Sequence, residues 1–468
     1  MIYLVSRYLI YFIQFITSLV IAAELGPYYM GIWGFVLLLL QYFQQIHFGI
    51  ANSFNVLYVH HRENKQDCDN YIGNSLVLVS YLALLVVCFY FYYVLFGIKG
   101  FEKYHADKYI LWICLIAIFQ YYVMFFINLF RVKNQLNRVA FCQSVIVLLN
   151  FVCVFFFRGE QLITFLIAGY FVGNLLCMVL AITSGSIPRW TNISINTAYQ
   201  KEILKKGLYL FLYNSCFYFI IISIRTIISG NYTVEEFGMF SFSFTLAHAI
   251  LLLLEALSFV IFPKVISKLS SNNKEDVLST IIMLRTVYIT SAHFLIYIAL
   301  IFFPVLLRFF PKYDGALTTL NLIALTILMN TNSYGYLELL ISRNKEKESA
   351  FISLFALSIN CFIALVLIHV FHVSYSYVIL ATLLTYLVFS VLAVLLGERQ
   401  LEEHASLTRW FPPRLFIPYI IGLAISIAQE HLLIFVAFLL FLFLNSRQLI
   451  EIKTSAMALL NAPNKANL

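Results

Sequence analysis

Residues 109–157 read YILWICLIAIFQYYVMFFINLFRVKNQLNRVAFCQSVIVLLNFVCVFFF. Two apolar runs, Tyr109–Phe130 and Phe141–Phe157, flank a short gap that contains three basic residues. A helix that crosses the hydrocarbon core of a bilayer needs about 20 mostly apolar residues. The stretch therefore predicts two membrane-spanning helices joined by a basic loop.

The same alternation of apolar runs and short gaps extends over the whole chain. Of its 468 residues 62% are hydrophobic and only 11% are charged, and the mean hydropathy is +0.89, which is far from the values of a soluble domain. We therefore expect an all-α polytopic membrane protein with about 14 (12–14) transmembrane helices; the closely spaced short runs near the C-terminus also fit twelve spans plus a re-entrant or interfacial pair. The predicted spans are Tyr3–Ala23, Gly31–Phe54, Ile72–Leu95, Tyr109–Phe130, Phe141–Phe157, Leu162–Ile182, Leu208–Ser229, Phe237–Phe262, Ile281–Leu307, Ala316–Ile341, Ala350–Val370, Ser374–Leu396, Leu415–Ala428 and His431–Asn445.

The distribution of basic residues predicts the orientation. Of the 30 Lys and Arg residues, 23 lie in or beside alternate gaps, whereas the other gaps hold 6. Because basic residues are retained on the cytoplasmic side, we expect both termini in the cytoplasm. The net charge of +8 is then explained by topology, and no nucleic-acid partner is predicted.

The longest gaps predict the domain organisation. Residues 184–207, SGSIPRWTNISINTAYQKEILKKG, combine a proline, polar residues and a basic amphipathic run, which is typical of a linker followed by an interfacial helix. The predicted parts are an N-terminal six-helix bundle (1–186), a cytoplasmic linker (187–207), a C-terminal six-helix bundle (208–396), an additional helix pair (397–446) and a cytoplasmic tail (447–468).

Two stretches that join predicted spans resemble each other. Residues 24–35 read ELGPYYMGIWGF, and residues 229–242 read SGNYTVEEFGMFSF. Each has a small residue, a short polar turn, and then a glycine, Gly31 or Gly238, that can allow the close backbone approach of a tight helical hairpin. The echo favours a transporter of two repeated bundles with a cavity at their interface, although apolar hairpins can also resemble each other by chance.

Several motifs carry a family resemblance. LGPYYMG (25–31), GNYTVEEFGMFSFSFTLAHAI (230–250), VIFPKVISKLS (260–270), FFPKYDGALTTLNLIAL (309–325) and LLISRNKEK (339–347) together resemble Wzx-type polysaccharide flippases. These belong to the multidrug/oligosaccharidyl-lipid/polysaccharide (MOP) exporter superfamily, which also contains drug/cation antiporters and the lipid II flippase. The chain departs from many relatives at Ala23 and Glu24, where a basic residue is common, and at Arg225, near which an acidic residue is common.

The resemblance implies a function. Such a protein is a transporter and not an enzyme, and it moves undecaprenyl-pyrophosphate-linked oligosaccharide, a repeat unit of O-antigen (lipopolysaccharide), capsule or exopolysaccharide, across the bacterial cell inner membrane by alternating access. No cofactor is expected, and H⁺ or Na⁺ is the possible coupling ion. Family members work beside a polysaccharide polymerase and a chain-length regulator.

Ionisable residues inside predicted spans are candidate site residues, because burying a charge in lipid is costly. Arg7 and Arg225 can bind pyrophosphate, since a guanidinium matches phosphate geometry with two parallel hydrogen bonds; the alternative is that both extend to headgroups. Glu255, deep in its predicted span, and Glu338 are candidates for ion coupling. The alternative for Glu255 is a neutral or ion-paired structural residue, and the alternative for Glu338 is a residue at the level of the headgroups, with Arg343 as its possible partner.

Amide side chains recur in two predicted spans. They cannot face lipid without leaving donors unsatisfied, so we expect them to face other helices or water. They can bind sugar hydroxyls in a cavity, or they can form interhelical hydrogen bonds. The candidate substrate-binding amides are Gln41, Gln44, Gln45 and Asn52 in the second span and Asn330 and Asn332 in the tenth.

Other functions are less compatible with the sequence. A drug or cation antiporter of the same fold should favour a negatively charged cavity, yet the predicted spans of the first half contain no carboxylate. A membrane-embedded polysaccharide polymerase or ligase needs a large periplasmic loop, and no predicted outer gap is long enough. A channel or a structural membrane component remains a third alternative. The chain has no GxxxxGK[ST] phosphate loop and no predicted metal site.

Overall fold

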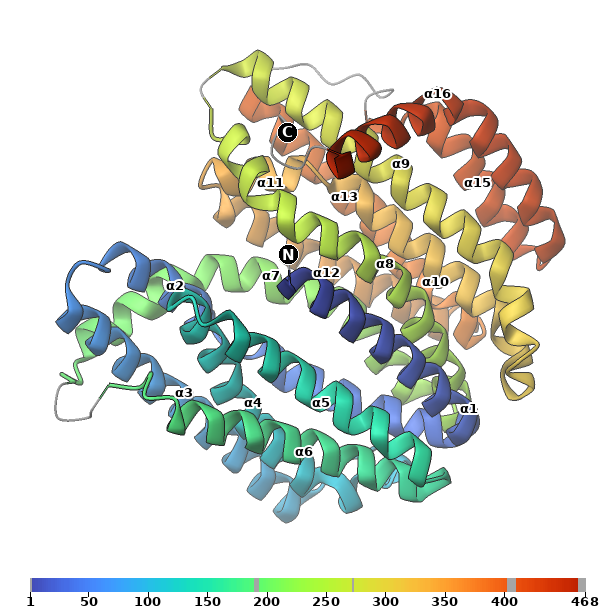
Figure 1. Ribbon diagram of the computed structural model, residues 1–468. Coiled ribbons are helices and arrows are strands. Elements are labelled where there is room, and N and C mark those ends of the chain that lie inside the picture. Colours follow the sequence, from blue (N-terminus) through green and yellow to red (C-terminus); the bar gives the residue numbers. More distant parts are fainter. Residues whose placement is uncertain (1, 189–192, 272, 402–409, 462–468) are drawn as a thin grey trace. The chain divides into compact units, whose positions relative to one another are not determined.

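The computed structural model describes residues 2–188, 193–271, 273–401 and 410–461 (Figure 1). Side chains are described for the same residues except 2–8, 209, 210, 251–267 and 455–461. Every regular element in the described part of the chain is an α-helix or a short 3₁₀ turn. The contacts divide the chain into two units, Met1–Ser241 and Phe242–Leu468, each a helical bundle.

In its described residues, unit 1 contains seven complete α-helices and the start of an eighth. Its elements are α1 (Ile2–Gln45), α2 (Ile50–His60), α3 (Lys65–Phe96), the 3₁₀ turn η1 (Glu102–Tyr104), α4 (Ala106–Val132), α5 (Leu136–Phe156), α6 (Gly159–Thr183), α7 (Thr197–Asn231) and the first residues of α8 (Val234–Leu269). Helix α5 packs against α6, and both run beside α4 and α1 (Figure 1).

Unit 2 contains the remainder of α8 and the helices that follow. They are α9 (Lys274–Leu307), η3 (Pro311–Ala316), α10 (Leu317–Asn330), η4 (Thr331–Ser333), α11 (Tyr336–Ser342), α12 (Glu346–His369), η5 (Tyr375–Tyr377), α13 (Ile379–Leu401), α15 (Pro413–Ile427), η6 (His431–Leu433) and α16 (Ile434–Asn461). Helices α15 and α16 pack together and contact α9 and α10 (Figure 1).

Ten helices in the described part of the chain are long and apolar enough to cross a membrane. They keep large apolar side chains on the surface: Leu95, Phe96 and Phe156 are each more than 70% exposed. Such extensive apolar exposure is costly in water and favourable in a bilayer. Length, hydropathy and surface therefore agree that these helices span a membrane.

Helix α1 contains the first predicted span and most of the second. The chain breaks between them at Gly26, where φ is 66° and the helical conformation is interrupted. Pro27 follows and has no N–H to donate to a preceding turn. The predicted hairpin therefore turns at the Gly26-Pro27 pair of the LGP sequence.

The two stretches that echo each other in sequence pack against each other inside unit 1. A Cβ atom at Gly238 on α8 would overlap the carbonyl oxygen of Pro27, and a Cβ at Gly31 would overlap that of Val234. The two helix starts thus touch backbone to backbone, which only glycine allows. The predicted close backbone approach exists, but it joins residues 24–35 to residues 229–242 and does not lie within either stretch.

The 3₁₀ turn η1 stabilises the region of this backbone contact. The Tyr104 ring stacks on Phe35 with centroids 4.2 Å apart, and its hydroxyl donates to the carbonyl oxygen of Ser229 at 2.9 Å. Lys103 Nζ donates to the carbonyl oxygen of Tyr232 at 2.9 Å, and burial lowers the pKa of this lysine below its ordinary value. The end of α7 is therefore tied to α1 through η1.

Two spans that were predicted to be continuous are broken. The second span was expected over Gly31–Phe54, but α1 ends at Gln45 and α2 begins at Ile50, with Gly49 in the left-handed region. The tenth was expected over Ala316–Ile341, but α10 ends at Asn330 and α11 begins at Tyr336 after a 3₁₀ turn. Hydropathy averaged over a whole span does not detect these breaks, because each covers only four or five residues between long apolar runs, although residues 331–335 (TNSYG) are themselves polar.

The predicted linker leads directly into a long helix. Helix α7 begins at Thr197 and runs without interruption through the predicted seventh span, so its basic start is not a separate helix. Asn74 of α3 holds the segment before it, since its Nδ2 donates to the carbonyl oxygen of Ser194 at 2.8 Å and its Oδ1 accepts from the Asn196 N–H at 3.0 Å. Helix α7 therefore packs with α1–α3 in unit 1.

The close backbone contact at Gly31 and Gly238 can be tested by adding a single methyl group. Gly238→Ala should lower the midpoint of thermal unfolding, because the new methyl overlaps the Pro27 carbonyl oxygen, and overpacking of this kind costs on the order of 1–3 kcal/mol. Gly230→Ala on α7 is the matched control: its Cβ would meet no atom within 4 Å, so its helix propensity should leave stability unchanged or raise it by up to about 1 kcal/mol. The measurement is thermal unfolding of the detergent-solubilised protein, and equal midpoints for the two variants would contradict the packing.

Candidate functional site

Arg225 of α7 lies inside unit 1. Its side chain is only 3% exposed. Nη1 donates to Gln41 Oε1 at 2.6 Å, and Nη2 donates to the carbonyl oxygen of Gly34 at 3.1 Å. The structure thus brings two predicted site residues, Arg225 and Gln41, into direct contact between α7 and α1, away from the surface position that the headgroup alternative requires.

The contact between α1 and α7 continues along both helices. The Tyr42 hydroxyl and Thr226 Oγ1 are 2.6 Å apart, and Ser215 Oγ donates to the carbonyl oxygen of Gln45 at 3.3 Å. Part of the polar face of the second predicted span, including Gln41, therefore faces α7, as expected of interhelical hydrogen bonds. Gln44 is exposed and Asn52, on α2, is half-buried, so the break after Gln45 separates the predicted amides.

Arg225 is also distinctive in its charge. Among the residues of unit 1 whose side chains the structure describes, it is the one charged residue that is buried. The other buried polar side chains there are Ser, Thr and Asn. A buried guanidinium that keeps its charge makes this part of unit 1 electropositive, which suits an anionic group.

In unit 2 a second arginine, Arg285 of α9, stabilises the broken tenth span. It is 7% exposed, and Nη1 donates to the carbonyl oxygens of Asn332 at 2.5 Å and Tyr334 at 3.2 Å. Nη2 donates to Asn332 Oδ1 at 3.3 Å and to the carbonyl oxygen of Trp410 at 3.1 Å. Arg285 therefore supplies hydrogen bonds to carbonyl groups that a continuous helix would have satisfied itself.

Glu338 caps the helix that restarts after the break. Its side chain is 8% exposed, and Oε2 accepts a hydrogen bond of 2.5 Å from the N–H of Gly335, whose φ of 91° starts α11. Arg343, its possible partner from sequence, instead donates to the carbonyl oxygen of Ser271 at 2.7 Å. A carboxylate at this position also suits the positive end of a helix.

A second carboxylate completes this cluster. Glu398 of α13 is 2% exposed, and its Oε1 and Oε2 accept from the Tyr336 hydroxyl at 3.0 Å and from Trp410 Nε1 at 3.2 Å. The Arg285 guanidinium lies 5.0 Å from the centroid of the Tyr336 ring. The cluster joins α9, α11, α13 and the segment before α15.

The remaining predicted site residues are placed as follows. Asn332 is bonded to Arg285, whereas Asn330 is half-buried with a buried Oδ1 that has no hydrogen-bond partner. The side chains of Arg7 on α1 and Glu255 on α8 lie outside the described residues. Their roles stay predictions.

Sequence reasoning missed the structural importance of Arg285, Glu398 and Trp410. One signal was present: Arg285 lies four residues inside the predicted span Ile281–Leu307, where an unexplained charge is costly. Nothing in the sequence connects it to Asn332, Tyr334 or Trp410. Within the described residues, no group of three or more His, Cys, Asp or Glu side chains could hold a metal ion.

Comparison with protein families provides the identification. Residues 1–270, more than half of the chain, match the model of a family described as "Polysaccharide biosynthesis protein". The chain belongs to this polysaccharide biosynthesis protein family. No curated protein matches its sequence.

Solved structures show the fold of this family member. The lipid II flippase MurJ in an inward closed conformation is similar with a TM-score of 0.69 and 13% identity, over 97% of this chain and 99% of that one. An inward-facing multidrug resistance MATE family transporter of the MOP superfamily is similar with a TM-score of 0.67 and 14% identity, over 85% and 98%. A MOP superfamily transporter from Pyrococcus furiosus, described as having a binding pocket of reverse polarity, gives 0.53 and 13%, over 86% and 94%.

These similarities confirm part of the sequence interpretation. The protein is an all-α multi-pass membrane protein with the fold of MOP-superfamily transporters, as predicted, and its family is described as one of polysaccharide biosynthesis. Sequence identities near 14% establish the fold alone. The Wzx type, the substrate and the site residues remain predictions.

The role of Arg285 can be tested by removing its hydrogen bonds. Arg285→Met should strongly reduce the yield of folded protein, because three main-chain carbonyl groups lose a charged donor and each such bond contributes about 1.5–3 kcal/mol. Arg447→Met is the control, since that side chain is 87% exposed and, among the described residues, pairs with Glu451; it should change stability by less than about 1 kcal/mol. Fluorescence-detected size-exclusion chromatography compares the two, and a monodisperse, equally stable Arg285→Met protein would contradict the role.

Proposed function

We propose that this protein moves an undecaprenyl-pyrophosphate-linked oligosaccharide across a bacterial inner membrane. The lipid chain would stay in the bilayer while the pyrophosphate and the sugars pass through a polar path. Membership in the polysaccharide biosynthesis protein family and the transporter fold support this proposal. One of the similar structures is itself a lipid II flippase.

The observation that carries the proposal is the buried charge of Arg225. A pyrophosphate group that is esterified at both ends is a dianion, and it needs compensating positive charge in a medium of low polarity. Arg225 supplies such a charge within unit 1 and is oriented by Gln41 and by the Gly34 carbonyl oxygen. We propose that it binds the pyrophosphate together with Arg7.

The amide side chains suit the sugar portion of the substrate. Gln44 is exposed and Gln45 and Asn52 are half-buried in unit 1, so their donors and acceptors can reach hydroxyl groups. In unit 2, Asn330 keeps an acceptor without a partner, whereas Asn332 is occupied by Arg285. We propose that Gln44, Gln45 and Asn52 in unit 1 and Asn330 in unit 2 bind sugar hydroxyls. Asn332 is proposed to have a structural role.

The driving force is proposed to be an ion gradient. Since Glu338 already caps α11, Glu255 is the better candidate to bind H⁺ or Na⁺ in one state of the transport cycle. The basic gaps support a topology with both termini in the cytoplasm. A polysaccharide polymerase and a chain-length regulator are the proposed partners.

A drug or cation antiporter is the alternative with the same fold. A cationic substrate needs a negatively charged site, and in the described part of unit 1 the one buried charge is positive. The charge of Arg225 therefore favours an anionic substrate.

Deletion of the gene in its native host tests the substrate class. Surface polysaccharide should disappear while undecaprenyl-pyrophosphate-linked repeat units accumulate at the cytoplasmic face, because the enzymes that assemble them remain while their transport is lost. Lipid extraction with glycan labelling measures the lipid-linked units, and staining of surface glycan measures the exported polysaccharide. Unchanged surface glycan together with a higher sensitivity to cationic drugs would replace the proposal with the antiporter.

Variants returned to the deletion strain test Arg225. Arg225→Gln should reduce surface glycan at least about tenfold at equal protein level in the membrane, because the loss of charge-assisted hydrogen bonds costs about 1.5–3 kcal/mol. Arg225→Lys keeps the charge but lacks the paired donors of the guanidinium, so its surface glycan should be intermediate between that of Arg225→Gln and that of wild type. Arg131→Gln, an exposed arginine of the same unit, should behave as wild type. Full export by a stable Arg225→Gln protein would exclude Arg225 from the site.

A further inference from the structure

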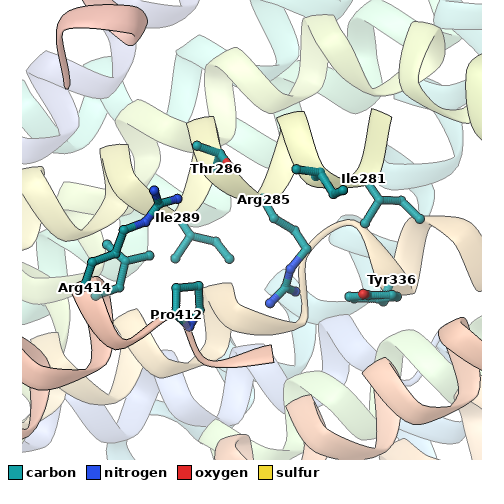
Figure 2. Close-up of a pocket in the computed structure, with 9 residues that line it drawn as sticks. Ile281, Arg285, Thr286, Ile289, Tyr336, Pro412 and Arg414 are labelled. Carbon is teal, nitrogen blue, oxygen red and sulfur yellow. The ribbon is translucent and has the colours of Figure 1, made fainter. Parts of the chain in front are cut away.

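Unit 2 contains a pocket between α9 and the start of α15 (Figure 2). Its volume is about 230 Å³, many times the roughly 10–15 Å³ that one water molecule needs. Arg285 enters from α9 and Arg414 from the beginning of α15, on either side of Ile289 (Figure 2). The pocket is therefore large enough for a ligand group and is lined by two cations.

Arg414 is the arginine with unused hydrogen-bonding capacity. Its side chain donates no hydrogen bond to any residue in the described part of the chain, and its Nε is buried without a partner. A buried donor in this state is costly, and such an orphan points to a group that the structure does not contain. No residue in the described part of the chain supplies the acceptor, and a ligand group or water can supply it.

Arg285 adds a second positive charge to the pocket lining. Its described hydrogen bonds all go to neutral oxygen atoms of Asn332, Tyr334 and Trp410. Neither Arg285 nor Arg414 forms an ion pair with a carboxylate that the structure describes. The nearby Glu398 is engaged by Tyr336 and Trp410. Glu398 and Glu338 interact electrostatically with Arg285 without forming an ion pair, so Arg414 is the positive charge of the pocket lining that no described carboxylate compensates.

The backbone adds to this positive character. Helix α15 begins at Pro413, and its N-cap residue, Pro412, provides no side-chain hydrogen bond. The start of a helix carries a partial positive charge and favours anions such as phosphate. Pro412 and Leu415 line the pocket, so it lies directly at this helix start.

The remaining wall is apolar and reaches the surface. Ile281, Ile289 and Leu415 are buried, whereas Ile282 is 45% exposed on the outer side of α9. Helix α9 is one of the helices long and apolar enough to cross the membrane. A ligand here would have its charged group between the arginines and an apolar part beside α9 in the bilayer.

We propose that this pocket binds the phosphate group of a membrane lipid. Arg414 donates to the phosphate oxygens, Arg285 contributes charge while it holds the broken tenth span, and the lipid chain lies along Ile282. The site lies wholly within unit 2 and does not depend on Arg225 or on the proposed transport function. The lipid phosphate could belong to a bilayer phospholipid or to a polyprenyl phosphate.

Native mass spectrometry of the purified full chain can test the site. The probes are phosphatidylglycerol, diacylglycerol with the same chains, undecaprenyl phosphate and inorganic phosphate. Wild type should retain phosphatidylglycerol or undecaprenyl phosphate, and Arg414→Gln should weaken that binding about tenfold or more, because a charge-assisted bond is lost. Arg414→Lys should bind with intermediate affinity.

The controls show whether binding requires the lipid phosphate and the Arg414 guanidinium. Arg447→Gln, on the highly exposed arginine of α16, should bind as wild type does. Tighter retention of undecaprenyl phosphate than of phosphatidylglycerol would assign the site to the polyprenyl lipid, and the reverse would assign it to the bilayer. Equal binding of diacylglycerol, binding of inorganic phosphate as tight as that of the lipids, or equal binding by Arg414→Gln and Arg447→Gln would each overturn the proposal.

Thermal unfolding distinguishes loss of the ligand from loss of the fold. Because the Arg414 side chain donates no hydrogen bond to a described residue, Arg414→Gln should unfold at the wild-type temperature without added lipid. Phosphatidylglycerol or undecaprenyl phosphate should raise the unfolding temperature of wild type and not that of the variant. An identical rise in both proteins would exclude Arg414 from lipid binding.

Discussion

The structure depends on a single constraint: within lipid, every backbone polar group needs a partner inside the protein. Continuous helices meet this requirement by themselves, and breaks in them need other donors. At the break in the tenth predicted span, Arg285 donates to the carbonyl oxygens of Asn332 and Tyr334, and Glu338 accepts the N–H of Gly335. A charged side chain is costly in a bilayer. Here Arg285 and Glu338 stabilise the irregular backbone because they form the hydrogen bonds that its carbonyl and N–H groups need.

Close backbone packing is the second determinant, and it uses glycine. Gly238 and Gly31 let the beginning of α8 touch the α1 hairpin inside unit 1, while η1 ties the end of α7 to α1. Without a hydrophobic driving force between helices in lipid, small residues and interhelical hydrogen bonds must supply the association. Arg225 follows the same logic, since its bonds to Gln41 and Gly34 join α7 to α1 and also retain a buried positive charge.

Hydropathy and charge were sufficient to predict the helical membrane fold, because each helix that crosses the lipid needs a run of about 20 mostly apolar residues. They could not predict the breaks at residues 46–49 and 331–335, because each break is only four or five residues long and an average over a whole span hides it, although residues 331–335 (TNSYG) are polar. The sequence also indicated Arg225 and Gln41 as site residues, one from its charge and the other from its amide, but their contact joins residues 184 positions apart. Arg285 shows the same limit: its charge is visible in the sequence, whereas its carbonyl partners lie 47 to 125 positions away and depend on the tertiary structure.

The central claim is that the protein carries a lipid-linked pyrophosphate glycan through a path that contains a buried cation. Its most direct test is transport by the purified protein in vesicles that hold a fluorescent undecaprenyl-pyrophosphate oligosaccharide in the inner leaflet only. With an H⁺ or Na⁺ gradient, the account predicts that the glycan becomes accessible to an external lectin, and that Arg225→Gln vesicles lose most of this signal while Arg131→Gln vesicles retain it. Transfer at the rate of protein-free vesicles under every gradient, by protein that is folded and correctly inserted, would contradict the claim.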